Sequence, residues 1–377
     1  HYRADDALWL FPTVYKYIAE TGNTAYLDEE IPFADHDVGT VREHLKRAID
    51  FSMHHLGTHG MPAGLHADWN DCLRLGATGE STFVAFQLYY ALRIMQEFCE
   101  DEPEYVQYLK DTAEKLLEII QRTCFEGDRF IRGYTEAGQI IGSKNDEEAS
   151  MWLNPQSWAV ISGGATPEQG EIIMETAYEK LNTPYGLEVM APAYRFKAFD
   201  GAAMILFNPG TKENGGVFCQ IQGWAILAEA LLGHGNRAFQ YFAESSPASF
   251  NDDADRRVIE PYVHGQFIEG HDSPFAGRSH VHWLTGTAST VMVGCVEGIL
   301  GLRPTPRGIA VKPAIPEEWD GFTMEKYFRG KHLKITVDNS AHRQGNPRKY
   351  VLNGIEMDAG LIPAESLQDD NELTVIM

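Results

Sequence analysis

Residues 283–311 read WLTGTASTVMVGCVEGILGLRPTPRGIAV and mark a change in the pattern of the chain. Before about residue 302, apolar residues recur at intervals of three and four, which is the period of a helix packed on one side. After it, apolar and polar residues alternate between Gly, Pro and Asn, which is typical of short strands. We therefore predict a mainly α chain, with a helical domain at 1–302 and a small β domain at 303–377.

Helices are predicted where the spacing of three and four is bounded by polar starts and by Gly or Pro stops. They are expected at 7–21, 40–56, 81–100, 103–122, 167–181, 222–234 and 282–301. The segments 156–160 and 222–226 both read Gln-x-Trp-Ala, and both are expected to open a helix after a loop. This echo suggests a repeated helical architecture whose long polar loops converge on a pocket.

The charge and cysteine content limit the classes of function. The chain has 31 basic and 54 acidic residues, and its formal net charge is −23. Such a charge repels nucleic acid and anionic lipid, so neither is expected as a partner. The sequence has no apolar run long enough to span a bilayer, and its five widely spaced cysteines do not suit a disulfide framework. We expect a cytoplasmic enzyme that acts on a small molecule.

The segment HADWNDC, residues 66–72, places two carboxylates beside an indole. Glycosidic cleavage needs a proton for the leaving oxygen, and a partly desolvated carboxylic acid near an aromatic ring keeps that proton near neutral pH. Asp68 and Asp71 both fit this role. Asp and Asn are also favoured in turns and helix caps, so a structural role stays open. A metal site is not expected, because no second histidine cluster accompanies His66.

Two later segments carry groups that could bind a sugar or an anion. In NPGTKENGG, residues 208–216, Lys212 can donate to hydroxyls or phosphate and Glu213 can accept from hydroxyls. In HWLTGTAS, residues 282–289, hydroxyls and backbone N–H groups at a predicted helix start can hold an anion. A solvated turn and an ordinary Ser or Thr cap would have the same composition.

Together and in this order, these segments resemble the inverting sugar phosphorylases that act on cellobiose, cellodextrins, chitobiose and laminaribiose. The resemblance is carried by DDALWL at 5–10, TGNTAYLDEEIPF at 21–33, HGMPAGLHADWNDCLRLG at 59–76, NPGTKENGGVFC at 208–219, EPYVHGQFIEG at 260–270 and HWLTGTAS at 282–289. It implies an (α/α)6 barrel, a toroid of helical hairpins, followed by a small β domain. It also implies that inorganic phosphate attacks the anomeric carbon, which releases a sugar 1-phosphate of inverted configuration and a free acceptor sugar.

The resemblance also implies roles for individual residues. The general acid corresponds to Asp71, and a residue of the sugar-binding wall corresponds to Trp69. The other positions correspond to phosphate contacts at Thr285 and Gly286 and to the sugar subsites at Lys212, Glu213 and Gln266. One protein carboxylate suffices, because phosphate replaces the base-activated water of an inverting hydrolase. No cofactor is expected, since phosphate is itself a substrate.

Two departures limit what the resemblance implies. Gln220 stands where the cellobiose enzymes have a histidine that contacts phosphate, and an amide cannot become a cation. The family's phosphate-binding arginines, an aspartate of the glucosyl subsite and an amino-terminal β domain lie upstream of the segment that resembles DDALWL. This chain begins with His1 and enters HYRADDALWL at once. We therefore expect an amino-terminal truncation and weak phosphate binding by the fragment.

The leading hypothesis is phosphorolysis of a β-linked disaccharide or short oligosaccharide of glucose, with a homodimer implied for the full-length protein. A competing hypothesis is an inverting glycoside hydrolase on the same scaffold, with Asp68, Glu213 or Glu269 as the base. A third hypothesis is a non-catalytic carbohydrate-binding remnant. Neither the linkage nor the acceptor sugar follows from a single sequence.

Overall fold

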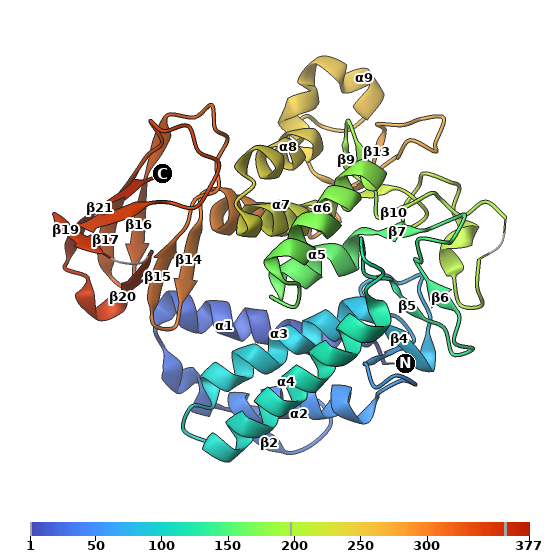
Figure 1. Cartoon of the computed structure of the whole chain (residues 1–377), viewed down its shortest axis with the longest axis horizontal. Helices are drawn as coiled ribbons and strands as arrows, with labels where there is room; N and C mark the ends of the chain where they lie inside the picture. Colours follow the sequence, from blue (N-terminus) through green and yellow to red (C-terminus); the bar gives the residue numbers. More distant parts are fainter. Residues whose placement is uncertain (1, 197, 358–359) are drawn as a thin grey trace.

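The computed structural model describes residues 2–196, 198–357 and 360–377. Helices dominate the chain up to Ile299, and strands follow from Leu302 (Figure 1). The helices are α1 (Leu10–Thr21), α2 (Val41–His54), α3 (Thr82–Phe98), α4 (Pro103–Cys124), α5 (Leu153–Ile161), α6 (Pro167–Leu181), α7 (Cys219–Leu232), α8 (Gly235–Ser245), α9 (Ala254–Arg257) and α10 (Thr287–Val293). In the described ranges, no helix combines the length and the apolar character needed to cross a membrane.

The helices form an inner and an outer set. Helices α1, α3, α5, α7 and α10 pack against one another in that order, whereas α2, α4, α6 and α8 each pack on a neighbouring inner helix. Helices α3 and α7 bury residues around most of their circumference, while α2 and α4 bury one stripe and expose a polar face. At the centre, the rings of Trp9, Phe83, Trp158 and Trp224 lie 5.5 to 5.9 Å apart. This aromatic cluster joins α3, α5, α7 and the residue that precedes α1.

Local signals start and stop several helices. The Thr40 hydroxyl accepts the backbone N–H of Glu43, and the Glu43 carboxylate accepts the backbone N–H of Thr40, so a capping box starts α2. Thr166 and Gln169 form the same arrangement at the start of α6. Gly233 ends α7 in the left-handed conformation, with φ of 88°. The chain can therefore reverse within two residues and enter α8.

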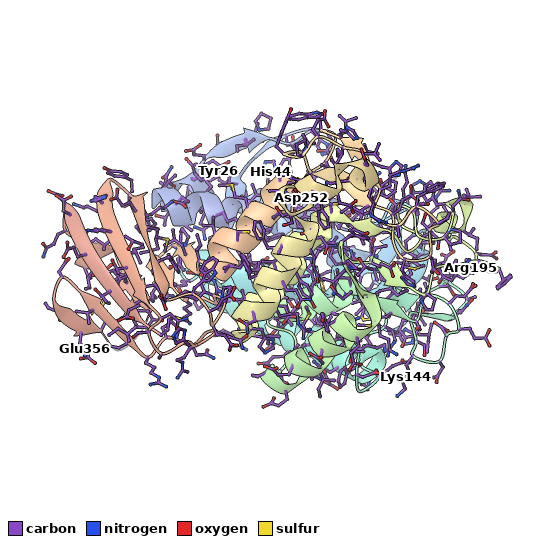
Figure 2. All side chains as sticks on the ribbon, turned by 90° about the horizontal axis from the view of Figure 1, so that it is seen from above. Tyr26, His44, Lys144, Arg195, Asp252 and Glu356 are labelled. Atoms are coloured by element: carbon purple, nitrogen blue, oxygen red, sulfur yellow. The ribbon has the colours of Figure 1, made fainter. Side chains whose placement is uncertain are left out.

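From α2 onward, long and short connections alternate. The long ones are 55–81, 125–152, 182–218 and 246–286, the last of which contains α9, and the short ones are 99–102, 162–166 and 233–234. Helices joined by short loops run antiparallel, so alternate connections lie at the same end of the helical set. These four long loops therefore gather at one end, whereas the connection 22–40 between α1 and α2 lies at the other. Figure 2 labels Arg195 at that end and Glu356, among the carboxyl-terminal strands, at the opposite end.

Short strands tie the long loops together. One sheet has the order β3 (Ala63–Leu65), β4 (Gly76–Ser81), β5 (Gly133–Tyr134), β6 (Ile140–Ile141), and another has the order β11 (Val217–Phe218), β12 (Gly265–Ile268), β13 (Ser279–His282). The remaining pairs are β7 (Met151–Trp152) with β10 (Met190–Ala191), β8 (Asn182–Thr183) with β9 (Gly186–Leu187), and β1 (Glu30–Pro32) with β2 (Val38–Thr40). Because distant loops pair in this way, the loop end is an ordered surface.

The carboxyl-terminal strands form two further sheets. The larger has the order β16 (Gly321–Phe328), β17 (Lys331–Asp338), β21 (Asp370–Ile376), β18 (Lys349–Leu352), β19 (Ile355–Met357), and the smaller has the order β14 (Leu302–Thr305), β15 (Gly308–Val311), β20 (Leu361–Pro363). Strands β17 and β21 are parallel, and the other pairs are antiparallel. In β17, Leu333, Ile335 and Val337 are buried between exposed neighbours, as the alternation in the sequence predicts.

Several helices differ from those predicted from the sequence. The segments expected to open helices at 156 and 222 lie inside α5 and α7, which begin at Leu153 and Cys219. Helix α8 is not predicted, because it begins at Gly235, two residues after Gly233, and such glycines are typical of a helix stop. The helix predicted at 282–301 begins instead at Thr287, since residues 279–282 pair with β12 as strand β13. A turn of π-helix, Gly294–Ile299, completes it.

Candidate functional site

The loop 66–72 between β3 and β4 is anchored by a buried ion pair. Arg132 Nη2 lies 2.7 and 2.6 Å from the two carboxylate oxygens of Asp68, and Ser81 Oγ donates to the same carboxylate at 2.7 Å. The side chains of Arg132 and Asp68 are 0% and 1% exposed. The carboxylate also accepts the backbone N–H of Asn70 at 2.8 Å. Asp68 is therefore the anchor of the loop, and both of its oxygens are engaged inside the protein.

Asp71, the second aspartate of this loop, lies at the surface. Its side chain is 60% exposed and forms an ion pair with Arg3. The backbone N–H of Ala4 donates to the Ala67 oxygen at 2.8 Å, and this pairing brings Arg3 beside Asp71. From the sequence we expect a proton donor that is partly shielded from water. Asp71 is instead exposed and paired with a cation, because Asp68 takes the buried position.

Trp69 connects the loop to helix α7. Its indole N–H donates to Gln220 Oε1 at 3.0 Å. The ring also packs edge to face on Phe218 at a centroid distance of 4.9 Å and on Trp224 at 5.5 Å. Gln220 lies in the first turn of α7, and its backbone oxygen accepts from Thr290 Oγ1 at 2.8 Å. Trp69 and Gln220, which stand in separate segments of the sequence, are therefore in direct contact.

Gln220 also faces the segment that precedes α10. A Cβ atom on Gly286 would lie 3.2 Å from Gln220 Nε2, so the amide nitrogen comes close to the Gly286 backbone. Since Oε1 already accepts from Trp69, the amide N–H groups are the part of Gln220 left to bind an anion. Thr285 Oγ1 lies 2.6 Å from Thr287 Oγ1 and accepts the Thr287 N–H at 3.2 Å. The Thr285 hydroxyl thus forms a turn with the first residue of α10, and Gly286, which has no side chain, occupies the capping position.

The loop that carries Lys212 is held in a strained shape. Lys212 has φ of 48°, a left-handed conformation that is uncommon for a side chain of this kind. A Cβ on Gly216 would approach Lys212 N to 2.8 Å, which explains the glycine there. The buried Asn214 amide donates to the oxygens of Tyr194 and Phe207 at 3.0 and 2.9 Å. These contacts fix Lys212, whose Nζ lies 5.0 Å from the Phe207 ring centroid.

Glu213, next to Lys212 in the chain, interacts with Cys72, which follows Asp71. The Cys72 thiol and the Glu213 carboxyl lie close enough to affect each other's pKa. Burial raises the pKa of Cys72 to about 12, and the charge of Glu213 contributes to this shift. Burial also raises the pKa of Glu213, and Lys212 and Asp71 act on it with opposite signs. Asp71, Cys72, Lys212 and Glu213 therefore form one electrostatic cluster.

For Gln266, the structure shows a position on a strand and no hydrogen bond of the side chain to another described residue. It lies in β12 just before Phe267, and successive side chains of a strand leave opposite faces. Phe267 lines a cavity that Lys212 also lines. Among the residues that the structure describes, none forms a hydrogen bond with the Gln266 side chain. The structure places Gln266 at the loop end, in the strand that pairs with β11 and β13.

The cavity beside Lys212 has a volume of about 700 Å³, within the range of small-ligand sites. One wall is formed by residues 206–212 and the other by residues 267–280, with Arg195 at the rim. Arg278 and His280 lie on the second wall. The cavity thus adjoins the cluster around Asp71 and combines cationic, hydroxyl-binding and aromatic groups.

The carboxylates that a hydrolase would need differ in their availability. Glu269 is 5% exposed, and its two oxygens bind His280 Nε2 at 2.6 Å and Ser273 Oγ. Asp68 is likewise engaged through both oxygens. Of the three candidates for a base, Glu213 alone keeps a carboxylate oxygen, Oε2, without a partner in the described chain. No group of three or more His, Cys, Asp and Glu residues in that part of the chain is arranged to hold a metal ion.

Several residues that shape the site are missed by reasoning from the sequence. Asp5 is buried, accepts the Trp9 indole N–H at 2.8 Å and leaves its Oδ1 without a partner in the described residues. Burial and the nearby charge of Asp68 raise the pKa of Asp5 to about 7. The segment DDALWL marks this position but not its burial. Arg3 and Arg132 have no local signal, because their partners lie more than sixty residues away in the sequence.

Residues 1–301 match the family model described as the catalytic domain of the glycosyl hydrolase 94 superfamily. The chain belongs to this superfamily. The matched range ends at Gly301, one residue before the carboxyl-terminal sheets begin. It includes every residue of the electrostatic cluster and of the cavity beside it.

Several curated relatives of the chain are named phosphorylases, so the resemblance drawn from the sequence is confirmed. The N,N'-diacetylchitobiose phosphorylase of Vibrio proteolyticus is 37% identical, over 99% of this chain and 47% of that protein. The solabiose phosphorylase of Paenibacillus borealis is 31% identical, over 96% of this chain and 48% of that protein. The chain therefore spans about half the length of the curated relatives it matches.

A solved structure shares the fold at low sequence identity. The GH78 family rhamnosidase of Bacillus sp. GL1 is 14% identical to the chain and superposes with a TM-score of 0.51. The similarity covers 88% of this chain and 32% of that one. It concerns the fold alone.

Proposed function

We propose that the protein catalyses the inverting phosphorolysis of a β-linked disaccharide or short oligosaccharide, giving a sugar 1-phosphate and a free acceptor sugar. The observation that carries the proposal is the clustering of Asp71, Trp69, Gln220 and Lys212 at one end of the helical set. These residues come from two loops and one helix start. Asp71, Trp69 and Lys212 stand out in the sequence alone, and Gln220 stands out by the family resemblance. Membership of the glycosyl hydrolase 94 superfamily supports the same reaction.

In this proposal Asp71 protonates the oxygen of the glycosidic bond. A sugar seated on the loop would cover the exposed carboxyl, displace Arg3 and bring the glycosidic oxygen within reach of Asp71. Phosphate attacks the anomeric carbon from the opposite face, so no second carboxylate is required. This explains why the buried, fully engaged Asp68 is compatible with activity.

The proposed phosphate subsite lies between Trp69 and the start of α10. The amide N–H groups of Gln220 would donate to phosphate, together with backbone N–H groups near Gly286 and the hydroxyl of Thr285. Hydrogen bonds from a neutral amide are weaker than those from a cation. We therefore propose that phosphate binds weakly unless further cations are supplied.

The sugar subsites are proposed on the other side of Asp71. Trp69 would form part of the wall, Lys212 and Glu213 would bind hydroxyls, and Gln266 would lie beside them. The cavity of about 700 Å³ next to Lys212 offers room for the acceptor sugar. We keep a glucose disaccharide as the first substrate to test, and N,N'-diacetylchitobiose as the second because a 37% identical relative bears that name.

We also propose how the helices and sheets are organised into domains. The inner and outer helices are proposed to be an (α/α)6 barrel at residues 1–302, and the sheets at 303–377 a separate β domain. A homodimer is proposed for the full-length protein. The five cysteines have free thiols, which suits the reducing cytoplasm proposed as the location.

The test is to incubate the protein with cellobiose, laminaribiose and N,N'-diacetylchitobiose, with and without inorganic phosphate, and to identify the products by NMR. The proposal expects an α-configured sugar 1-phosphate that forms only when phosphate is present. Sugar release without phosphate would favour the hydrolase alternative with Glu213 as the base. Sugar binding without turnover would favour the non-catalytic alternative.

A further inference from the structure

A histidine in the cavity beside Lys212 is held by a buried carboxylate. His280 Nε2 lies 2.6 Å from Glu269 Oε1, and Ser273 Oγ donates to the other oxygen of Glu269. Glu269 is 5% exposed, whereas the His280 side chain is 36% exposed. Both residues line the cavity. Burying a carboxylate costs free energy unless it is hydrogen-bonded, and Glu269 is hydrogen-bonded to Ser273 and to His280. Its bond to His280 orients that partly exposed ring.

The ring is also fixed by stacking. His280 and Phe267 are direct cross-strand partners in β13 and β12. Their rings lie 4.8 Å apart at an angle of 8°. The hydrogen bond and the stacking together leave His280 a single orientation, with one edge against Glu269 and the other edge free of hydrogen-bond partners within the described residues.

The hydrogen bond between His280 Nε2 and Glu269 determines what the other ring nitrogen, Nδ1, can bind. An ionised carboxylate only accepts hydrogen bonds, and Glu269 accepts one from Ser273 and one from His280. The hydrogen of a neutral imidazole therefore sits on Nε2, and Nδ1 carries a lone pair. Lys212, on the facing loop, offers N–H donors to the same cavity. A hydroxyl group placed between the two walls can accept from Lys212 and donate to His280.

We propose that His280 is a specificity-determining residue for the acceptor sugar, and that Glu269 is the positioning residue that sets its orientation and tautomer. This inference rests on the proposed function, since it takes the cavity as the place where the acceptor binds. His280 Nδ1 accepts a hydroxyl hydrogen of that sugar. Acceptors that lack the matching hydroxyl, or that present it in the other configuration, leave the nitrogen unpaired and bind more weakly.

The experiment uses His280→Phe, which keeps the stacking on Phe267 and removes the nitrogen. Its matched control is His271→Phe, because His271 Nδ1 lies 2.7 Å from Glu188, a carboxylate that is 1% exposed, outside the lining of the cavity. Both variants strand a buried carboxylate, so any general destabilisation is common to them. Glu269→Gln is a third variant that keeps the shape of the wall and alters the tautomer.

Binding of glucose, its epimers galactose and mannose, and N-acetylglucosamine is measured by calorimetry, and the KM values for acceptor and sugar 1-phosphate are measured in the synthetic direction. His280→Phe should weaken acceptor binding about three- to tenfold, the loss of one neutral hydrogen bond, with the KM for sugar 1-phosphate unchanged. Glu269→Gln should shift the preference between epimeric acceptors. His271→Phe should change neither quantity.

An acceptor affinity within about twofold of wild type in His280→Phe would overturn the inference, as would equal losses in His280→Phe and His271→Phe. If His280→Phe fails to fold by circular dichroism, an unaltered acceptor preference in Glu269→Gln would overturn it. Failure of the proposed function has a different signature. In that case the wild-type protein forms no sugar 1-phosphate, while the calorimetric comparison of variants still decides the role of His280.

Discussion

Replacing Arg132 by methionine tests whether the loop of Asp71 depends on a buried ion pair. Arg132 and Asp68 are 0% and 1% exposed, and the arginine also donates to Ser81 Oγ at 2.9 Å. Removing one partner of such a pair leaves the other charge buried and costs about 3–5 kcal/mol. Arg132→Met should therefore lower the free energy of unfolding by about 3–5 kcal/mol at neutral pH, in urea titrations followed by tryptophan fluorescence.

Two further variants isolate the cause. Lys326 pairs with Glu20 at 2.8 Å on the surface, so Lys326→Met should cost less than about 1 kcal/mol. The double variant Arg132→Met with Asp68→Asn no longer strands a charge, and its loss should fall short of the sum of the single losses by about 0.5–3 kcal/mol. A loss below about 1 kcal/mol for Arg132→Met, or strictly additive losses in the double variant, would refute the reasoning.

Two other predictions concern the phosphate subsite and the pH dependence. Gln220→His should tighten phosphate binding about fivefold below about pH 6, because a protonated imidazole donates a stronger hydrogen bond than an amide. An unchanged phosphate affinity, measured by calorimetry, would show that Gln220 does not lie in the phosphate subsite. The pKa of Asp5 is about 7 in the folded chain against an ordinary value of 3.8, so the folded state binds the extra proton between these values and stability falls as pH rises from about 4 to 7. Asp5→Asn should therefore gain up to about 3 kcal/mol relative to wild type between about pH 5 and pH 8, and parallel pH profiles of urea unfolding would count against this.

Those features that are carried by short segments can be predicted from the sequence. The helical spacing locates most of the inner and outer helices, and the alternation after residue 302 locates the strands that begin at Leu302. The segments 66–72 and 208–216 locate Asp71 and Lys212 because each is a punctuated loop with unusual polar content. Such signals lie within a short stretch of chain, so one sequence suffices to find them.

Features that depend on distant partners could not be predicted in this way. Arg132 pairs with the buried Asp68, and Arg3 pairs with the exposed Asp71. No residue near either aspartate in the sequence indicates these partners. The pairing of Glu269 with His280 depends on the register of β12 with β13. Burial then determines which carboxyl is an anchor and which faces the substrate, and burial is a property of the whole fold.

The variant Asp71→Asn decides whether Asp71 is the proton donor. The substitution removes the transferable proton but little volume, so kcat for phosphorolysis should fall by about a hundred- to ten-thousandfold while disaccharide binding stays within about twofold. Asp35→Asn is the matched control, because Asp35 is also an exposed aspartate paired with an arginine, Arg47 of helix α2, at 2.5 Å. Near-wild-type formation of sugar 1-phosphate by Asp71→Asn would show that Asp71 is not the proton donor.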